Sequence, residues 1–515
     1  MKYRRFALLI AGLTMVLAVF FQLKSQNAQY RTHQHKQATV TELQNPDGTG
    51  CITRTPESQY RYDAAAVDVE KLQTHLPLVI LETDEKIPGA PYYEDASAQM
   101  LYTMADNGDD EAWATMKIID NRDTVNTPKD APVLLNNIKI RVRGNSSRWF
   151  DKKSYAVKLV DGMGNHENKK VLGMEANHSW ALHGPFLDKT LMRNYIGMNI
   201  SGELMNYAPD VRFCEVILNG DYQGLYLLME TVNRGKGRIN VEKPNMTRNV
   251  TGYIIELDNG YMSPLTSPNN FTKYTGVLHD VAFFDIVYPD ATALTPEIKD
   301  YITKDLSRCE KALYSYDYDT KKYGFQTFMD VGEFTDYLIL NEVFLQHDMG
   351  NLSTYFYKGV DGLFSPCVWD FNHSMGNASI SAENDFSVLQ FVSVQAPWFW
   401  MMIKEETFID SVISRYHSLR QGILSDEEMI QYIEDTRDYL GSAVDRNFAV
   451  WGYSFDPENL DDYNKLRPLS QNPRSYDQAV EQMENTLLSR LHWLDENIEA
   501  LRQYSHPSAV KKFNQ

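Results

Sequence analysis

The sequence predicts an α+β protein whose strands are concentrated in its N-terminal half and whose helices dominate its C-terminal half. Two observations lead to this fold class. Segments that alternate apolar and polar residues recur between residues 76 and 260, which is the pattern of half-buried, mainly antiparallel strands. Apolar residues at spacings of three and four recur between residues 405 and 505, which is the pattern of amphipathic helices.

The strand segments in the N-terminal half follow one another closely. In the segment 154–159, Val157 and Leu159 share one face while Lys158 lies on the other, because successive side chains of a strand alternate. The dipeptide Asn219-Gly220 between two apolar runs is typical of a tight hairpin turn, since both residues tolerate positive φ angles. Strands are expected at residues 76–81, 111–119, 137–143, 154–159, 213–218, 224–230 and 252–257.

Three stretches in the middle of the chain and one long region near its end predict helices. The middle helices are expected over residues 188–204, 296–314 and 331–345. Asp188 is a candidate N-cap for the first of them, because a carboxylate accepts hydrogen bonds from free backbone amides. The C-terminal helices carry an apolar stripe formed by Val480, Met483, Leu487, Leu491, Leu494, Ile498 and Leu501. Such a stripe packs into a core.

Two aspartates flank a predicted hairpin after the third of these helices. Asp348 lies on a loop before one strand, and Asp370 follows the second strand of the pair. Two carboxylates one hairpin apart can share a substrate: one takes a hydroxyl proton while the other holds Mg²⁺ against phosphates. The alternative is that each aspartate only caps a turn.

A small polar turn separates the strands 137–143 and 154–159, and it consists of Gly144, Asn145, Ser146 and Ser147. A strand, a Gly/Ser turn and a strand with an inward lysine can roof a phosphate chain, because the turn amides and the Lys158 ammonium face the anion. A lysine on a strand that is simply solvated is the alternative.

The N-terminus predicts a membrane-directed segment. A cationic start is followed by an apolar run that ends near residue 23, which is typical of a signal anchor or a signal peptide. The absence of a small-residue cleavage motif favours the uncleaved anchor. We therefore expect residues 1–23 to anchor the chain, residues 24–75 to form a flexible polar tether, and the remainder to lie outside the cytoplasm, or to be secreted if the signal is cleaved.

Composition narrows the class of partner. The 515 residues carry 50 Lys+Arg against 69 Asp+Glu, a formal charge of −19. This balance argues against duplex nucleic acid, which needs a basic surface, but it does not argue against a nucleotide. A content of 43% hydrophobic and 23% charged residues is that of a globular chain.

These segments together resemble the CotH family, the spore coat protein H-like kinases. The resemblance runs from about residue 76 to the C-terminal helices and depends on five motifs in order. They are residues 143–147 with 152–155 and 158–159; Asp188 with residues 191–194; residues 219–230; residues 340–342 with Asp348; and residues 369–371. The resemblance implies an atypical protein-kinase-like bilobal fold, with an N-lobe over residues 76–260 and a helical C-lobe over residues 261–505.

The resemblance also implies roles for individual residues. Asp348 corresponds to the catalytic-loop acid, Asp370 to the metal-binding acid and Lys158 to the lysine that engages the α/β-phosphates of ATP. The turn at residues 144–147 corresponds to the phosphate-covering loop, and Glu230 ends the strand that enters the adenine hinge. Glu203 is a candidate ion-pair partner for Lys158, with Asp188 and Glu230 as rivals that spacing does not separate.

Two positions depart from the pattern that the resemblance implies. Where a kinase loop carries an asparagine metal ligand, this chain has Ser353, with Asn351 nearby. Asn372 stands where many relatives have an aspartate. Because Ser and Asn oxygens carry no charge, the second metal site is expected to be weak.

The implied function is transfer of the γ-phosphate of ATP, with Mg²⁺ or Mn²⁺, to serine of surface, secreted or spore-coat-type proteins. An acidic exterior favours serine-rich, basic protein substrates. Two other functions stay open: transfer of AMP or of an amino acid on the same fold, and a non-catalytic adhesin or structural protein. The adhesin would use Trp398-Phe399-Trp400 as a sticky patch, whereas core packing is the other explanation of that cluster.

Overall fold

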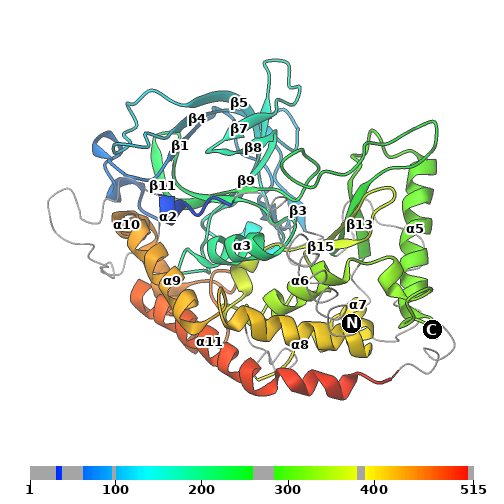
Figure 1. The fold of residues 1–515 in the computed structure, drawn as a ribbon. Helices are drawn as coiled ribbons and strands as arrows, with labels where there is room; N and C mark the ends of the chain where they lie inside the picture. The colour runs from blue at the N-terminus through cyan, green and yellow to red at the C-terminus, as the bar shows by residue number, and fades with distance from the viewer. Residues whose placement is uncertain (1–30, 38–61, 95–99, 259–282, 380–388, 508–515) are drawn as a thin grey trace, which may run out of the picture.

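The computed structural model describes residues 31–37, 62–94, 100–258, 283–379 and 389–507, and it confirms the α+β class (Figure 1). A closed β-barrel and a separate four-stranded sheet are combined with helices that cover the lower edge of the molecule in the view of Figure 1. Within these ranges no helix has the length and apolar character needed to cross a bilayer. The anchor expected at residues 1–23 lies outside them.

Seven strands close the barrel in the order β1-β10-β11-β9-β6-β5-β4. The β1–β10 pair is parallel and every other neighbouring pair is antiparallel. Closure leaves the barrel without an unpaired edge. The strands are β1 (Leu78–Glu82), β4 (Ala112–Ile119), β5 (Leu134–Val142), β6 (Tyr155–Val160), β9 (Ser179–His183), β10 (Val211–Leu218) and β11 (Asp221–Glu230).

The alternation read from the sequence is confirmed in the barrel. Tyr155, Val157 and Leu159 of β6 are buried in the barrel interior, and Lys158 points to the other face. The β10–β11 hairpin turns at Asn219 and Gly220, whose φ angles are 52° and 86°, as the tight turn requires. Two short two-stranded sheets are separate from the barrel sheet: β2 (Pro91–Tyr92) with β3 (Leu101–Tyr102), and β7 (Lys169–Val171) with β8 (Met174–Asn177).

A second, antiparallel sheet has the order β13-β12-β14-β15. Its strands are β12 (Tyr253–Asp258), β13 (Phe283–Tyr288), β14 (Thr354–Lys358) and β15 (Ser365–Cys367). The expected boundary at residue 260 placed β12 with the N-terminal strands. The structure instead pairs β12 with β13 and β14, because the chain leaves the barrel after β11 and starts a new sheet.

Helices cover this sheet and the base of the barrel. The expected C-terminal stripe is confirmed, since every residue of it is buried. Trp398 and Phe399 are also buried, at 2% and 0% exposure, so they belong to the core. The helices are α2 (Gln34–Gln37), α3 (Arg193–Leu204), α5 (Pro296–Tyr314), α6 (Val331–Val343), α7 (Pro397–Met402), α8 (Glu406–Arg420), α9 (Asp426–Leu440), α10 (Ser442–Trp451) and α11 (Tyr476–Asn497).

Helix α3 begins five residues later than the expected start at Asp188. The carboxylate of Asp188 accepts hydrogen bonds from the backbone amides of Thr190 and Arg193, and Leu191 adopts a left-handed φ of 66°. A side chain that bonds to amides two and five residues ahead holds a non-helical turn, so regular helix starts only at Arg193.

The described parts of the expected tether, residues 31–37 and 62–75, differ from the expectation because they pack on the folded body. Tyr62 donates a hydrogen bond to the carbonyl of Tyr222 at 2.6 Å, and its ring lies 4.6 Å from that of Trp451. Leu72 is 4% exposed and joins the main core. Residues 31–37 contact α3 and α9.

Candidate active site

The two predicted acids lie at one end of the β14–β15 hairpin. Asp348 precedes β14 and Asp370 follows β15, so the antiparallel pairing brings both loops to the same end of the sheet. The carbonyl of Asp348 accepts hydrogen bonds from the amides of Asn351 and Leu352, each at 3.0 Å. These bonds close the turn that carries the first acid.

The pKa of Asp348 depends on its burial and on nearby charges. Burial raises the pKa of Asp348 to about 6. The charge of His373 opposes this shift, whereas the negative charges of Asp370 and Asp258 add to it. The influence of the Asp370 charge agrees with the placement of both acids at the same end of the hairpin.

A further carboxylate from β12 faces the same region. Burial raises the pKa of Glu256 to about 7; a hydrogen bond from Tyr355 opposes the shift, and the charges of Asp258 and Asp285 add to it. Glu256 and Asp258 stand on β12, next to β14 in the sheet. We refer to Glu256, Asp258, Asp348 and Asp370 as the acidic cluster.

The barrel supplies basic groups opposite the acidic cluster. Arg143 follows β5, and its guanidinium lies 5.1 Å from the ring centroid of Trp369. Burial lowers the pKa of Arg143, and the charges of Tyr355, Asp370 and Glu256 oppose the shift. His183 ends β9; burial lowers its pKa to about 4, with the charge of Asp370 opposing. The site therefore lies where the barrel meets the second sheet.

Helix α3 holds the segment that carries Asp370. Asp370 has a left-handed φ of 54°, and its carbonyl accepts a hydrogen bond from the side chain of Gln346 at 2.7 Å. The next amide, of Phe371, donates to the Asn194 side chain at 2.7 Å. Asn194 in turn donates to Asn372 Oδ1 at 2.8 Å. Asn372, where the expected pattern has an acid, is thus engaged in holding its loop.

The uncharged ligands expected near Asp348 differ in their surroundings. The Oδ1 atom of Asn351 is buried and has no hydrogen-bond partner among the residues that the structure describes, so an acceptor is free there. Ser353 has a left-handed φ of 48°. Within the same ranges, no group of three or more His, Cys, Asp or Glu side chains is arranged to hold a metal ion. A cation at this place would need ligands from a bound molecule as well.

Lys158 lies on the outer face of the barrel, and its ammonium is 2.6 Å from Glu111 Oε1. Arg141 Nε is 3.9 Å from the same oxygen. The lysine side chain is 37% exposed. Lys158 and Arg141 thus flank one carboxylate on the face that also leads to Arg143.

The expected ion pair between Lys158 and Glu203 does not form, and this is a correction. Glu203 stands near the end of α3, where His33 Nε2 lies 2.6 Å from its carboxylate. The two rivals are also engaged elsewhere. Asp188 pairs with Arg193 at 2.5 Å, and Glu230 lies 3.4 Å from Arg238. The carboxylate of Glu230 also accepts a hydrogen bond from the Asp210 amide, so it secures the exit of β11 from the barrel.

The segment with Gly144, Asn145, Ser146 and Ser147 is longer than a hairpin turn. Gly144 has a φ of 112°, and its carbonyl accepts a hydrogen bond from Arg148 Nε at 2.6 Å. A short 3₁₀-helix over Ser146–Trp149 follows. Residues 144–146 are exposed. The segment follows Arg143 directly, which places it beside the basic groups of the site.

Sequence reasoning missed several groups of this site. The sequence assigns no role to Glu111, Arg141, His183, Glu256 or Asp258. Arg143 and Asn194 fall within the family motifs but receive no role of their own. The alternation of basic residues on β5 was a usable signal, because Lys139, Arg141 and Arg143 fall on one face.

The fold and the site define an α+β protein in which acidic loops of a helix-covered sheet face basic groups of a β-barrel. A family model described as CotH kinase protein matches residues 140–494, more than half of the chain, so the protein belongs to this family. The inner spore coat protein H of Bacillus subtilis (strain 168) is 24% identical over 250 residues. That alignment covers 46% of this chain and 59% of the relative.

Proposed function

We propose that the protein is an ATP-dependent protein kinase that transfers the γ-phosphoryl group to serine of a surface or spore-coat-type protein. The observation that carries the proposal is the convergence of Asp348 and Asp370 at one end of a hairpin, opposite Arg143. The description of the matching family, CotH kinase protein, supports the kinase activity, and the name of the Bacillus relative supports a spore-coat setting. The barrel and the helix-covered sheet would then act as the two lobes of a kinase-like fold.

The chemistry assigns separate tasks to the two acids. Asp348, with its pKa near 6, is ionised at neutral pH and can accept the hydroxyl proton of serine as the γ-phosphoryl group passes to the serine oxygen and ADP leaves. Asp370 and the free Oδ1 of Asn351 would hold Mg²⁺, with Ser353 as a further oxygen. Mg²⁺ takes one or two carboxylates and fills its shell with water and phosphate oxygens, so the lack of a three-carboxylate cluster fits.

The basic groups would bind the nucleotide. Lys158 and Arg143 would neutralise its phosphates, and the exposed turn at residues 144–146 would lie over them. The partner of Lys158 in this arrangement is Glu111, which orients the ammonium. We place the protein outside the cytoplasm, through the anchor expected at residues 1–23.

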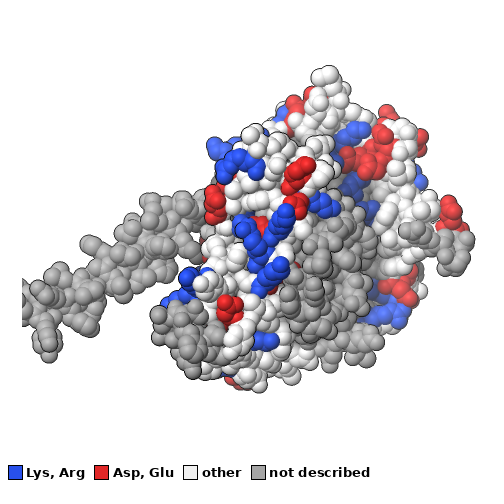
Figure 2. Space-filling model, turned by 90° about the vertical axis from the view of Figure 1, so that its right-hand side faces the viewer, with Lys and Arg blue, Asp and Glu red and all other residues white. Residues whose placement is uncertain are grey.

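The charge of the surface supports a basic acceptor only in part. The chain carries a formal charge of −19, yet the face in Figure 2 shows a band of Lys and Arg side chains. On α5, Lys304, Arg308 and Lys311 are exposed at helical spacing. A basic, serine-rich acceptor would therefore approach another face than this one.

The test is transfer of labelled γ-phosphate by the full chain to serine-rich acceptors, one basic and one neutral, with Mg²⁺ or Mn²⁺. Asp348→Asn should lower the transfer rate by at least about 100-fold while nucleotide binding persists. Asp370→Asn should abolish metal-dependent nucleotide binding. Asp361→Asn is the matched control, because Asp361 is an exposed acid at the opposite end of the same hairpin.

Intact mass of the modified acceptor identifies the group transferred. One added phosphate supports the proposal, whereas an added AMP or amino acid would replace it with the corresponding transferase. A parent protein that binds no ATP with either metal would contradict all three and leave a structural role. Equal transfer by the parent and Asp348→Asn would show that the assignment of the proton acceptor is wrong.

A further inference from the structure

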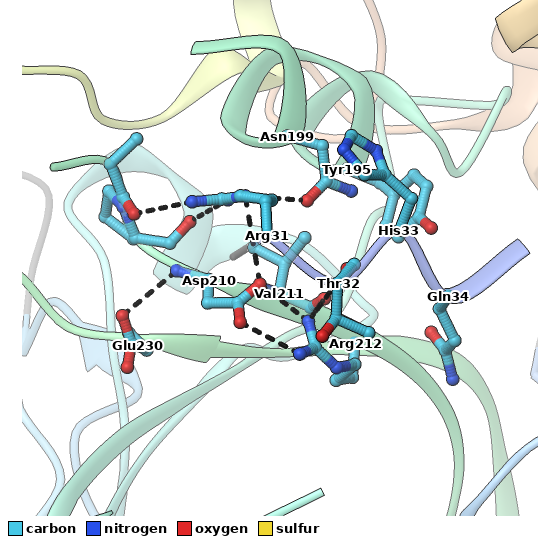
Figure 3. A network of polar contacts seen from close by, with 12 residues as sticks. Arg31, Thr32, His33, Gln34, Tyr195, Asn199, Asp210, Val211, Arg212 and Glu230 are labelled. Atoms are coloured by element: carbon cyan, nitrogen blue, oxygen red, sulfur yellow. Dashed lines mark hydrogen bonds and ion pairs between the residues drawn. The ribbon is translucent and has the colours of Figure 1, made fainter. Parts of the chain in front are cut away.

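Residues 31–37 lie across α3, the segment 208–213 and α9, and Arg31 is the centre of the contact (Figure 3). Its guanidinium donates hydrogen bonds to the side chain of Asn199 at 3.0 Å and to the carbonyls of Ala208 and Pro209 at 2.7 and 2.5 Å. Asp210 Oδ1 lies 3.9 Å from Arg31 Nε. The Arg31 side chain is 7% exposed, so the charge is buried among hydrogen-bond acceptors.

The residues after Arg31 continue the contact in a sequence-specific way. The Gln34 amide accepts a hydrogen bond from the backbone N–H of Phe213 at 2.7 Å and donates to its carbonyl at 3.2 Å. His33 bridges Glu203 at 2.6 Å and Tyr432 at 2.7 Å, which joins α3 to α9. On α3 the segment contacts Asn199 and Glu203 in the C-terminal half, and His35 Nδ1 also lies 2.8 Å from the Tyr195 hydroxyl near the start of the helix. A buried arginine and a paired amide fix both the register and the depth of the segment.

The N-terminal half of the same helix holds the Asp370 segment. Arg193 donates to the carbonyls of Ser374 and Met375 at 3.1 and 3.2 Å. The ring of Phe371 lies against Gly197 at a distance that leaves no room for a side chain there. With the Asn194 contacts described above, one rigid helix thus connects residues 31–35 to the loop that carries Asp370. Because a helix of this length is stiff, a displacement of one half is expected to displace the other half as well.

We propose that Arg31 is a positioning residue for the phosphoryl transfer: it seats residues 31–35 against α3, and α3 thereby holds Asp370 where it binds the metal. The inference rests on the proposed function and adds a part of the chain that lies far in sequence from the catalytic loops. The contacts of Arg31 are to α3 and to the segment 208–213, so it would act through α3 and not on the substrate or the metal itself. Loss of its contacts leaves Asn199 and two carbonyls without their donor, and α3 is then free to shift.

The experiment compares Arg31→Gln with the parent in the full chain. One readout is amide hydrogen exchange of residues 371–377, and the other is the Mg²⁺ concentration that half-saturates ATP binding. We expect severalfold faster exchange in residues 371–377 and an increase of about tenfold in the half-saturating Mg²⁺ concentration, the usual size for a residue that orients a metal ligand. Arg31→Lys should restore part of both, because it keeps the charge and one donor.

Arg502→Gln is the matched control, because Arg502 is an exposed arginine paired with Glu499 and Asp410 near the C-terminus. It should change neither readout. Exchange in barrel strands β4 and β5 reports global stability and should be the same in all variants. If Arg31→Gln does not fold, Gln34→Ala, which removes only the pairing with Phe213, must shift both readouts in the same direction by a smaller factor.

Faster exchange in α3 with unchanged exchange in residues 371–377 and unchanged Mg²⁺ dependence would overturn the inference and leave Arg31 a purely structural role. The exchange readout needs no catalysis. If the parent transfers no phosphate but the exchange of residues 371–377 responds to Arg31→Gln, the proposed function fails while the connection through α3 stands.

Discussion

Two acids, Glu342 and Asp348, lie close together in sequence but in contrasting environments. Glu342, at the end of α6, pairs with Arg490, and both side chains are 1% exposed. Its carboxylate also accepts hydrogen bonds from the amides of Val392 and Ser393 at 3.0 and 2.8 Å. Asp348 lies a short turn later: burial raises its pKa to about 6, and the negative charges of Asp370 and Asp258 add to the shift. The first acid is satisfied by the fold, and the second carries a cost that the fold does not relieve.

This difference separates structural acids from functional ones. An acid with a full set of partners stabilises the fold, and a ligand gains little from approaching it. An acid whose pKa is raised by burial and by neighbouring carboxylates gains stability when a cation or a proton arrives. Under the proposed function, the acidic cluster is therefore the part of the molecule where a metal ion and a serine hydroxyl would bind. Glu342 is part of the frame that holds it.

Replacing Glu342, the acid with a full set of partners, is expected to have the largest effect on stability. Glu342→Ala leaves the buried guanidinium of Arg490 uncompensated and is expected to lower the free energy of unfolding by about 3–5 kcal/mol. Urea denaturation of the full chain measures it. Glu458→Ala, at the exposed pair with Arg474, is the control and should leave the midpoint unchanged. A Glu342→Ala protein as stable as the parent would contradict the contrast between the two acids.

Replacing Asp348, the acid without a full set of partners, is expected to have the opposite effect and to raise the free energy of unfolding. The folded-state pKa of Asp348 is about 6 against an ordinary value of 3.8, so the folded state holds a proton that the unfolded state has lost. The contribution of Asp348 to the stability of the parent should therefore fall as pH rises from about 4 to 6. Asp348→Asn lacks this titration, so its free energy of unfolding at pH 8 should be about 1–3 kcal/mol higher than that of the parent.

Urea midpoints of the parent and Asp348→Asn at pH 4, 6 and 8 measure this difference. The gap between the two proteins should be smallest at the lowest pH and should widen up to about pH 6. Asp361→Asn should show no such widening, because Asp361 is exposed. A gap that is constant across the series would mean that the Asp348 carboxylate is as well solvated as an ordinary one.

The sequence predicts features that depend on local patterns and misses contacts between distant segments. The hairpin with Asp348 and Asp370 could be predicted because strand alternation and turn residues are local signals. The partner of Lys158 could not. Glu111 precedes β4 and Lys158 lies on β6, and the two meet only because both strands pair with β5 in the barrel. The late start of α3 has a local cause instead: the Asp188 side chain accepts hydrogen bonds from the amides of Thr190 and Arg193, a pattern that the residue type alone does not distinguish from a helix N-cap.

The docked N-terminal segment escaped prediction for a related cause. The polar stretch at residues 24–75 has no periodicity and indicates a tether, since its composition cannot form a core by itself. Arg31 and Gln34 find their hydrogen-bond partners on α3 and β10, which lie far away in sequence. Contacts of this kind depend on the assembled fold and leave no periodic trace in the chain.

The smallest effect tests how strongly the acids of the cluster act on one another. The negative charge of Asp258 raises the pKa of Asp348, so Asp258→Asn should lower it by a fraction of a unit. If Asp348 accepts the serine proton, the acid limb of kcat/KM in the parent lies near pH 6, because protonated Asp348 cannot act as the base. The limb should then move to lower pH in Asp258→Asn and stay in place in Asp361→Asn. A limb near pH 6 that does not move would assign the titration to another group and separate the acidic cluster from the chemistry.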